Sequence, residues 1–122
     1  MQTTDLVNRG VAKLLKKAGY SAGGRAYYNE ASEAIHISYA VGDWNTDPSQ
    51  YTAPTIAEAA KFLRDNYNLF VGAYPAVVLD LPTTWGVFVR RMEVCHDEQW
   101  FDEFPTYEAA MQCGLHKALE QI

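Results

Sequence analysis

A helix-start signal near the middle of the chain constrains the fold more than any other feature. Thr55 and Glu58 form a T-x-x-E capping box directly after Pro54, so the two side chains can satisfy backbone N–H groups that a first helical turn leaves unpaired. Asn68 tolerates the left-handed conformation that ends many helices. The spacing predicts an amphipathic helix between these signals. Its apolar stripe consists of Ile56, Ala59, Ala60, Leu63 and Tyr67, with Phe62 at the margin.

The segment from about Asp5 to Ala18 predicts an earlier helix, with Asp5 as its N-cap. Its apolar residues recur every three or four positions, and much of the remaining surface is basic. Gly19 can end this helix in the left-handed conformation, and Tyr20 can close the end with an apolar contact. The helix is therefore expected to bury one face and leave a positively charged face in water.

The last part of the chain predicts a third helix, which starts at Thr106 or Tyr107 with Thr106 as its N-cap. Gly114 lies in the middle of this helix, whose expected buried face consists of Ala110, Met111, Leu115, Ala118, Leu119 and Ile122. Glycine in the middle of a helix costs about 1 kcal/mol relative to alanine, and a close approach of a neighbouring backbone would explain why it is there. We therefore expect the third helix to pack tightly against another element at this residue.

Four segments between these helices are strand candidates. The alternation is clearest where Ile35, Ile37 and Tyr39 share one face of an extended segment. The candidates span residues 25–29, 34–41, 69–79 and 85–94. The resulting order is helix–hairpin–helix–hairpin–helix. It favours an α+β fold with one four-stranded, mostly antiparallel sheet and helices packed mainly on one face.

Length and composition limit the classes of protein to consider. The 122 residues suit a single α+β domain spanning 1–122. Fifteen acidic and ten basic residues give a net charge of −5, which argues against binding duplex nucleic acid through overall charge. The sequence contains neither a long apolar run nor a signal peptide, and two cysteines are too few for a disulfide framework. We expect a reduced, cytoplasmic protein that does not enter a membrane and has no cofactor.

Two motifs give the chain a resemblance to a known family. Ala53-Pro54-Thr55 and the following helix match an A-P-T-x-x-x-A-x-x-[WF]-[LF]-R-x-x-[YH]-[GN]-L pattern, and Phe104-Pro105-Thr106-Tyr107-Glu108-Ala109-Ala110 is similar to an F-x-T-Y-E-E-A ending. Because it contains both motifs, the chain resembles a family of small uncharacterised bacterial proteins that are often encoded near prophage or other mobile-element genes. That family has no established activity, so the resemblance carries over no functional residue. Because the sequence shows clear core signals and no catalytic constellation, we expect a small non-enzymatic accessory or interaction module.

Exposed-looking aromatic residues are the best candidates for a binding site. Trp44 and Tyr51 lie in a polar, turn-rich stretch, residues 42–53, and Trp100 lies in an acidic stretch before the last helix. Aromatic side chains contribute most to binding when a partner buries them. We therefore take Trp44, Tyr51 and Trp100 as candidate binding residues, for a protein partner or for a second copy of the chain. The alternative is that these rings lie over the core of their own domain.

A metal-assisted enzyme is a second hypothesis. Cys95, His96 and Asp97 are consecutive and could act with His36 or His116. Neither of the usual zinc-ligand spacings is present, so the simpler interpretation of residues 93–108 is a solvated acidic loop, and we assign no metal site.

The basic first helix supports a third hypothesis, a weak contact with nucleic acid. Its basic residues and Arg25 would form the contact. This hypothesis ranks low because four basic residues on the polar side of a helix are ordinary solvation. The residues in question are Arg9, Lys13, Lys16, Lys17 and Arg25.

Overall fold

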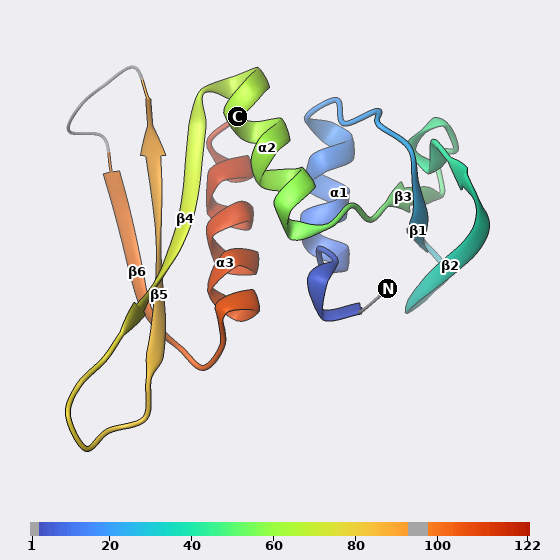
Figure 1. Ribbon diagram of the computed structural model, residues 1–122. Helices are drawn as coiled ribbons and strands as arrows, with labels where there is room; N and C mark the ends of the chain where they lie inside the picture. Colours follow the sequence, from blue (N-terminus) through green and yellow to red (C-terminus); the bar gives the residue numbers. More distant parts are fainter. Residues whose placement is uncertain (1–2, 93–97) are drawn as a thin grey trace.

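The computed structural model describes residues 3–92 and 98–122 (Figure 1). Three α-helices are present in these residues: α1 (Arg9–Lys17), α2 (Ile56–Tyr67) and α3 (Tyr107–Glu120), together with the short 3-10 helices η1 (Thr3–Asp5) and η2 (Trp44–Thr46). The strands are β1 (Gly24–Asn29), β2 (Ser32–Gly42), β3 (Gln50–Thr52), β4 (Leu69–Ala76), β5 (Thr84–Arg91) and β6 (Glu98–Phe104). None of the described helices is long and apolar enough to cross a membrane.

The strands form two separate antiparallel sheets, with the helices between them (Figure 1). One sheet has the order β2-β1-β3 and the other the order β4-β5-β6. The α+β class is confirmed, whereas the single four-stranded sheet expected from the sequence is wrong. Each predicted hairpin gains a third strand from a segment that was expected to be a loop, namely β3 from residues 42–53 and β6 from residues 93–108. Each hairpin thus completes a sheet of its own.

Local capping signals position the helices as the sequence indicates, with one exception. The capping box of α2 is present, and Asn68 ends that helix with φ of 54°. Gly19 follows α1 with φ of 95°, and the Tyr20 N–H donates to the Leu15 carbonyl. The N-cap of α1 is Asn8 rather than Asp5, because the intervening chain is extended and pairs with the segment that precedes α2.

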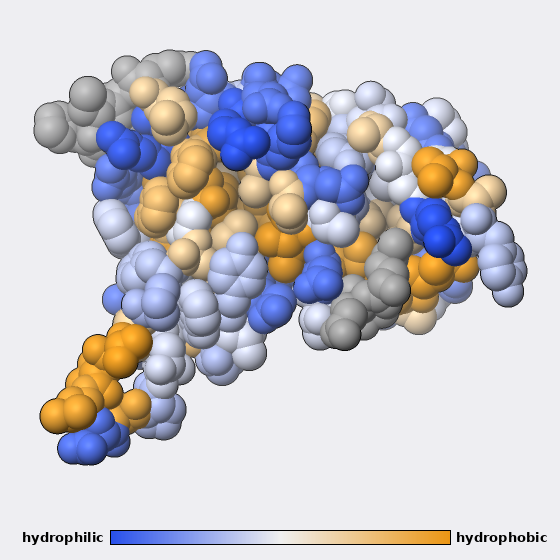
Figure 2. Space-filling model, in the orientation of Figure 1, coloured by the Kyte–Doolittle hydropathy of each residue, from blue (hydrophilic) through white to orange (hydrophobic). Residues whose placement is uncertain are grey.

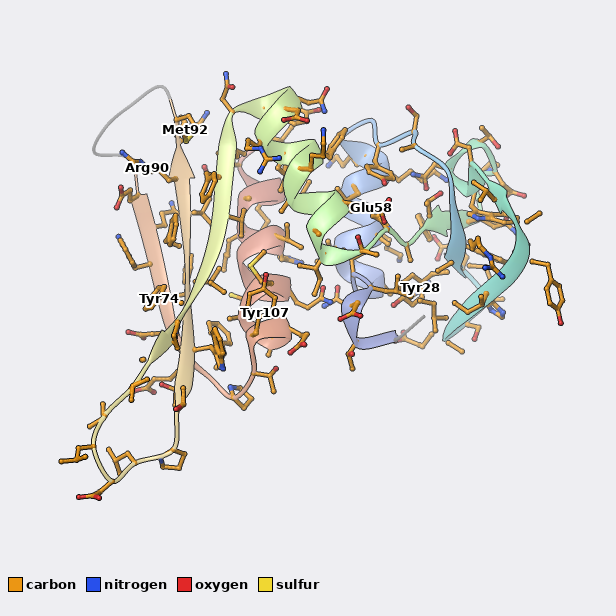
Figure 3. All side chains as sticks on the ribbon, viewed as in Figure 1. Tyr28, Glu58, Tyr74, Arg90, Met92 and Tyr107 are labelled. Atoms are coloured by element: carbon orange, nitrogen blue, oxygen red, sulfur yellow. The ribbon has the colours of Figure 1, made fainter. Side chains whose placement is uncertain are left out.

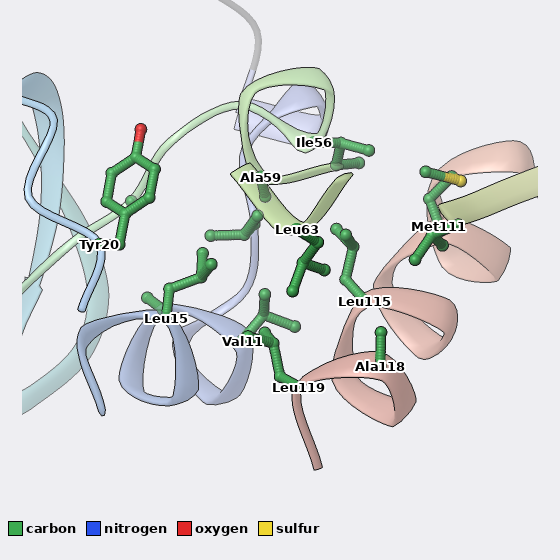
Figure 4. Close-up of a cluster of buried hydrophobic side chains, with 14 of the residues drawn as sticks. Val11, Leu15, Tyr20, Ile56, Ala59, Leu63, Met111, Leu115, Ala118 and Leu119 are labelled. Atoms are coloured by element: carbon green, nitrogen blue, oxygen red, sulfur yellow. The ribbon is translucent and has the colours of Figure 1, made fainter. Parts of the chain in front are cut away.

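The buried side chains gather where the three helices meet (Figure 4). Leu63 of α2 is fully buried and points toward Val11 of α1 and Leu115 of α3 (Figure 4). On its other side α3 packs against the β4-β5-β6 sheet, through contacts of Gly114 with Val71 and Val87. The helical layer is therefore the common core of the two sheets.

Candidate functional site: an aromatic sheet face

Trp44 supports the structure of its own loop. Its ring stacks on Tyr27 with centroids 4.3 Å apart, and its indole Nε1 donates to the Gly24 carbonyl at 2.8 Å. Its backbone N–H donates to the Thr52 hydroxyl at 3.1 Å. The ring thus holds η2 against the β2-β1-β3 sheet, which corresponds to the alternative of an aromatic residue lying over its own domain.

Tyr51 is largely buried between the first sheet and α1. The ammonium groups of Lys13 and Lys16 lie 5.5 and 5.0 Å from the centre of its ring, and its hydroxyl donates to the Glu30 carboxylate. That hydrogen bond lowers the pKa of Glu30, with a further contribution from the positive charges of Lys13 and Arg9. Tyr51 therefore belongs to a charged cluster that joins α1 to the β1–β2 turn.

This cluster predicts an acid-sensitive contribution to stability. Glu30 has a folded-state pKa below its ordinary value of 4.5, so its stabilising effect is complete above that value and is lost as the pH falls through the folded pKa. Glu30→Gln should lower the urea midpoint at pH 7 and should make the loss of stability from pH 7 to pH 3 smaller than in the wild type. Glu33→Gln is the control, because Glu33 also lies near Arg9, at 4.0 Å, but its side chain is 94% exposed. Equal acid sensitivity of wild type and Glu30→Gln would contradict the assignment.

Trp100 occupies a different environment, on the face of the β4-β5-β6 sheet that points away from α3. Strand alternation places it on that face beside Phe88, its cross-strand partner in β5. Its ring centroid lies 5.3 Å from that of Phe88 and 5.5 Å from that of Tyr74, and Phe70 stacks on Phe88 at 5.8 Å. We call Phe70, Tyr74, Phe88 and Trp100 the aromatic face.

Two glycines make room for two of these rings, those of Phe88 and Tyr74. A Cβ atom at Gly72 would come within 2.7 Å of the Phe88 ring, and one at Gly86 would clash with the Tyr74 ring. Each ring therefore crosses to the neighbouring strand and covers a position without a side chain. Such ring-on-glycine contacts stabilise an antiparallel sheet, and here they also hold the rings in fixed positions on its surface.

Trp100 is the most accessible ring of the aromatic face, with 58% of its surface exposed. Met92, also exposed, follows Arg90 at the end of β5 (Figure 3). The Arg90 guanidinium pairs with the Glu98 carboxylate at 3.2 Å. The exposed Asp102 adds a second carboxylate on β6, so the surroundings of the rings carry a net negative charge.

Of the residues named for a metal-assisted enzyme, the structure describes only His36 and His116. Cys95, His96 and Asp97 lie outside the described residues. His36 stacks on Tyr27, and His116 lies near Glu120 on α3. The residues that the structure describes contain no group of three or more potential metal ligands.

The basic residues of the nucleic-acid hypothesis mostly contact the protein itself. Arg9 and Lys13 pair with Glu30 at 3.1 and 3.7 Å. Lys16 donates to two backbone carbonyls, and Arg25 donates to the Ser38 carbonyl. Their charge is therefore partly neutralised or engaged in holding α1 and β1 in place.

The sequence singled out Trp100 as a candidate binding residue but not the rings that lie around it. The other three rings lie in strand segments that are apolar on both faces, namely Phe70, Tyr74 and Phe88. The sequence of such a segment does not show which face a helix covers and which face is exposed. The glycines at positions 72 and 86, each inside a strand candidate, were the signal that could have indicated a surface covered by large rings.

The chain was compared with family models, with curated proteins and with solved structures, and it matches none of them. The resemblance to mobile-element proteins therefore stays a prediction.

Proposed function

We propose that this protein is a non-enzymatic binding module, and that its aromatic face receives a basic segment of a partner protein. The observation that carries the proposal is the group of four neighbouring rings on a sheet face that points away from α3, with Trp100 more than half exposed. A rigid aromatic surface loses little conformational entropy on binding, and tryptophan and tyrosine are enriched among the residues that dominate binding energy.

The chemistry of the face favours arginine or lysine in the partner. Aromatic rings attract cations through their electron-rich faces, and guanidinium groups also stack on them. Glu98 is paired with Arg90, so the negative charge beside the rings comes from the exposed Asp102; this charge attracts a basic segment and opposes phosphate groups. A single-stranded nucleic acid, which could also stack on such rings, is therefore the poorer fit.

A selection from a random peptide library displayed on phage tests this proposal. Peptides retained by the wild-type protein should be enriched in Arg and Lys, and their affinity for Trp100→Ala should be about thirtyfold weaker, the loss expected of a residue worth about 2 kcal/mol. Asp102→Lys should also weaken the binding of these peptides, and the weakening should be larger at low salt than at high salt, because salt screens the added repulsion.

Tyr39→Ala is the matched control, because Tyr39 is a fully exposed aromatic residue on the other sheet. It should bind the selected peptides as the wild type does. Peptides that bind Trp100→Ala as tightly as the wild type, or that are enriched in acidic residues, would show that the aromatic face is not the binding surface or that its partner has another chemistry.

A further inference from the structure

The turn between β4 and β5 carries a second exposed apolar surface, separate from the aromatic face. Four aliphatic side chains project there with little contact to the rest of the protein; Figure 2 shows them as a hydrophobic projection at the lower left. Leu79 is 87% exposed. We call Val77, Val78, Leu79 and Leu81 the apolar tip. A contiguous apolar patch at the end of a hairpin is typical of an interaction site.

The apolar tip has a defined backbone conformation. The Leu81 N–H donates to the Val78 carbonyl at 3.1 Å, which closes a four-residue turn. Asp80 occupies the left-handed region with φ of 65°, a conformation that aspartate tolerates better than most residues. Pro82 restricts the chain that follows. A preformed turn needs little ordering when it binds, which favours docking into a complementary groove.

A groove of suitable character lies between the ends of α1 and α3. It has a volume of about 320 Å³ and is lined by apolar side chains with a lysine and a glutamate at its edge: Leu14, Lys17, Ala18, Leu119, Glu120 and Ile122. We call it the helix-end groove. Glu120 already lies near His116 and Lys117. Lys17, by contrast, takes part in no ion pair among the described residues.

We propose that the apolar tip docks into the helix-end groove of a second copy of this chain, with Asp80 of one copy facing Lys17 of the other. Both surfaces are mainly apolar; the tip carries Asp80, and the groove carries Lys17 together with Glu120, which already pairs with Lys117. Lys17 is thus the charge that is left to meet Asp80. Asp80, like Lys17, has no ion pair within the part of the chain that the structure describes. This charge pairing is what selects a second copy over other occupants of the groove.

The positions of the two surfaces make the contact intermolecular. The β4–β5 turn lies at the lower end of the second sheet, whereas the C-terminus and the helix-end groove lie at the opposite end of the helices (Figure 1). A tip therefore does not reach the groove of its own chain. In a two-fold dimer each tip meets the groove of the other copy, so that two identical contacts close the assembly. Asp80 at the turn opposes the alternative of insertion into a lipid surface, because burying a carboxylate in lipid is costly.

Sedimentation velocity tests the dimer with two charge-reversal variants. Wild type should sediment with twice the mass of one chain. Asp80→Lys and Lys17→Glu should each be monomeric, with dimer dissociation constants raised at least tenfold, because each variant places like charges opposite one another. An equimolar mixture of the two variants should recover the dimer, since one contact is then native and the other has both charges reversed. Both side chains are exposed, and circular dichroism verifies that the variants are folded.

Leu79→Glu provides a second line of evidence, because it changes the apolar contact without reversing an existing charge. It should also abolish the dimer, whereas Trp100→Ala should leave the dimer intact, so the result is independent of the proposed peptide-binding face. A wild-type monomer at all soluble concentrations, a dimer that survives Leu79→Glu, or a mixture that stays monomeric would overturn the proposal. Flotation of wild type, but not of Leu79→Glu, with phosphatidylcholine vesicles would also overturn it and assign the tip to a lipid surface.

Discussion

Leu63→Ala should destabilise the protein by about 2–5 kcal/mol, the range for removing a fully buried leucine side chain without collapse of the space around it. Leu63 is wholly inaccessible to solvent and lies where side chains from all three helices converge (Figure 4). Val11 of α1 and Leu115 of α3 face it from either side. Because small domains are stable by only about 5–15 kcal/mol, this one truncation removes a large part of the total.

The loss should affect both sheets together. The helical layer is the common core of the two sheets, and we expect unfolding in urea to be a single transition in both wild type and variant. Far-UV circular dichroism should show a lower midpoint for Leu63→Ala. Val41→Ala is the control: Val41 is 70% exposed on β2, so its truncation should change stability by less than about 0.5 kcal/mol. Equal effects of the two variants would mean that the cluster around Leu63 is not the centre of stability.

Features encoded by neighbouring residues could be predicted from the sequence. The capping box at Thr55 and Glu58, the left-handed exit at Asn68 and the N-cap at Thr106 all occur as expected. Each depends on a side chain bonding to backbone groups three residues away or on the conformational freedom of one residue. The prediction of Asp5 as the N-cap of α1 was wrong. The chain just before α1 pairs with the segment before α2, which is distant in sequence, and the N-cap is Asn8 instead.

The number of sheets could not be predicted in this way, because strand pairing joins residues that are distant in sequence. β3 has only three residues, too few for an alternation to be recognised. β6 contains Glu98, Asp102 and Glu103, which made it resemble a solvated loop. Its outward side chains can be charged because none of the described helices covers the outer face of that sheet. Because that face is open, Trp100 has polar neighbours in the sequence, and these made it a candidate binding residue. Phe88 lies in an apolar segment, so the sequence did not show that it neighbours Trp100.

The sequence predicted that a neighbouring backbone approaches α3 closely at Gly114; the close neighbours are instead the side chains of two valines. This contact makes a second large effect predictable. A Cβ atom at this position of α3 would lie 2.5 Å from a Val87 methyl group and 2.7 Å from a Val71 methyl group. Both valines are buried in the second sheet, so neither can move without disturbing the packing of α3 on that sheet. Inserting one methyl group there should cost about 1–3 kcal/mol. The higher helix propensity of alanine offsets about 1 kcal/mol of this cost. Gly114→Ala should therefore lower the free energy of unfolding by up to about 2 kcal/mol.

A double-mutant cycle with Val87→Ala separates crowding from any other consequence of Gly114→Ala. Val87→Ala removes the closer of the two contacts and leaves the one with Val71, so the penalty of Gly114→Ala should be smaller in that background than in the wild type. Gly10→Ala in α1 is the matched control, because a Cβ at Gly10 meets no atom closer than 3.6 Å and alanine should there leave stability unchanged or slightly raised. A penalty for Gly114→Ala that is the same in the wild type and in the Val87→Ala background would mean that the glycine does not serve the close contact of α3 with β5. A coupling of about 1 kcal/mol or more between the two sites would instead identify this contact as the one that fixes how closely the helical layer approaches the second sheet.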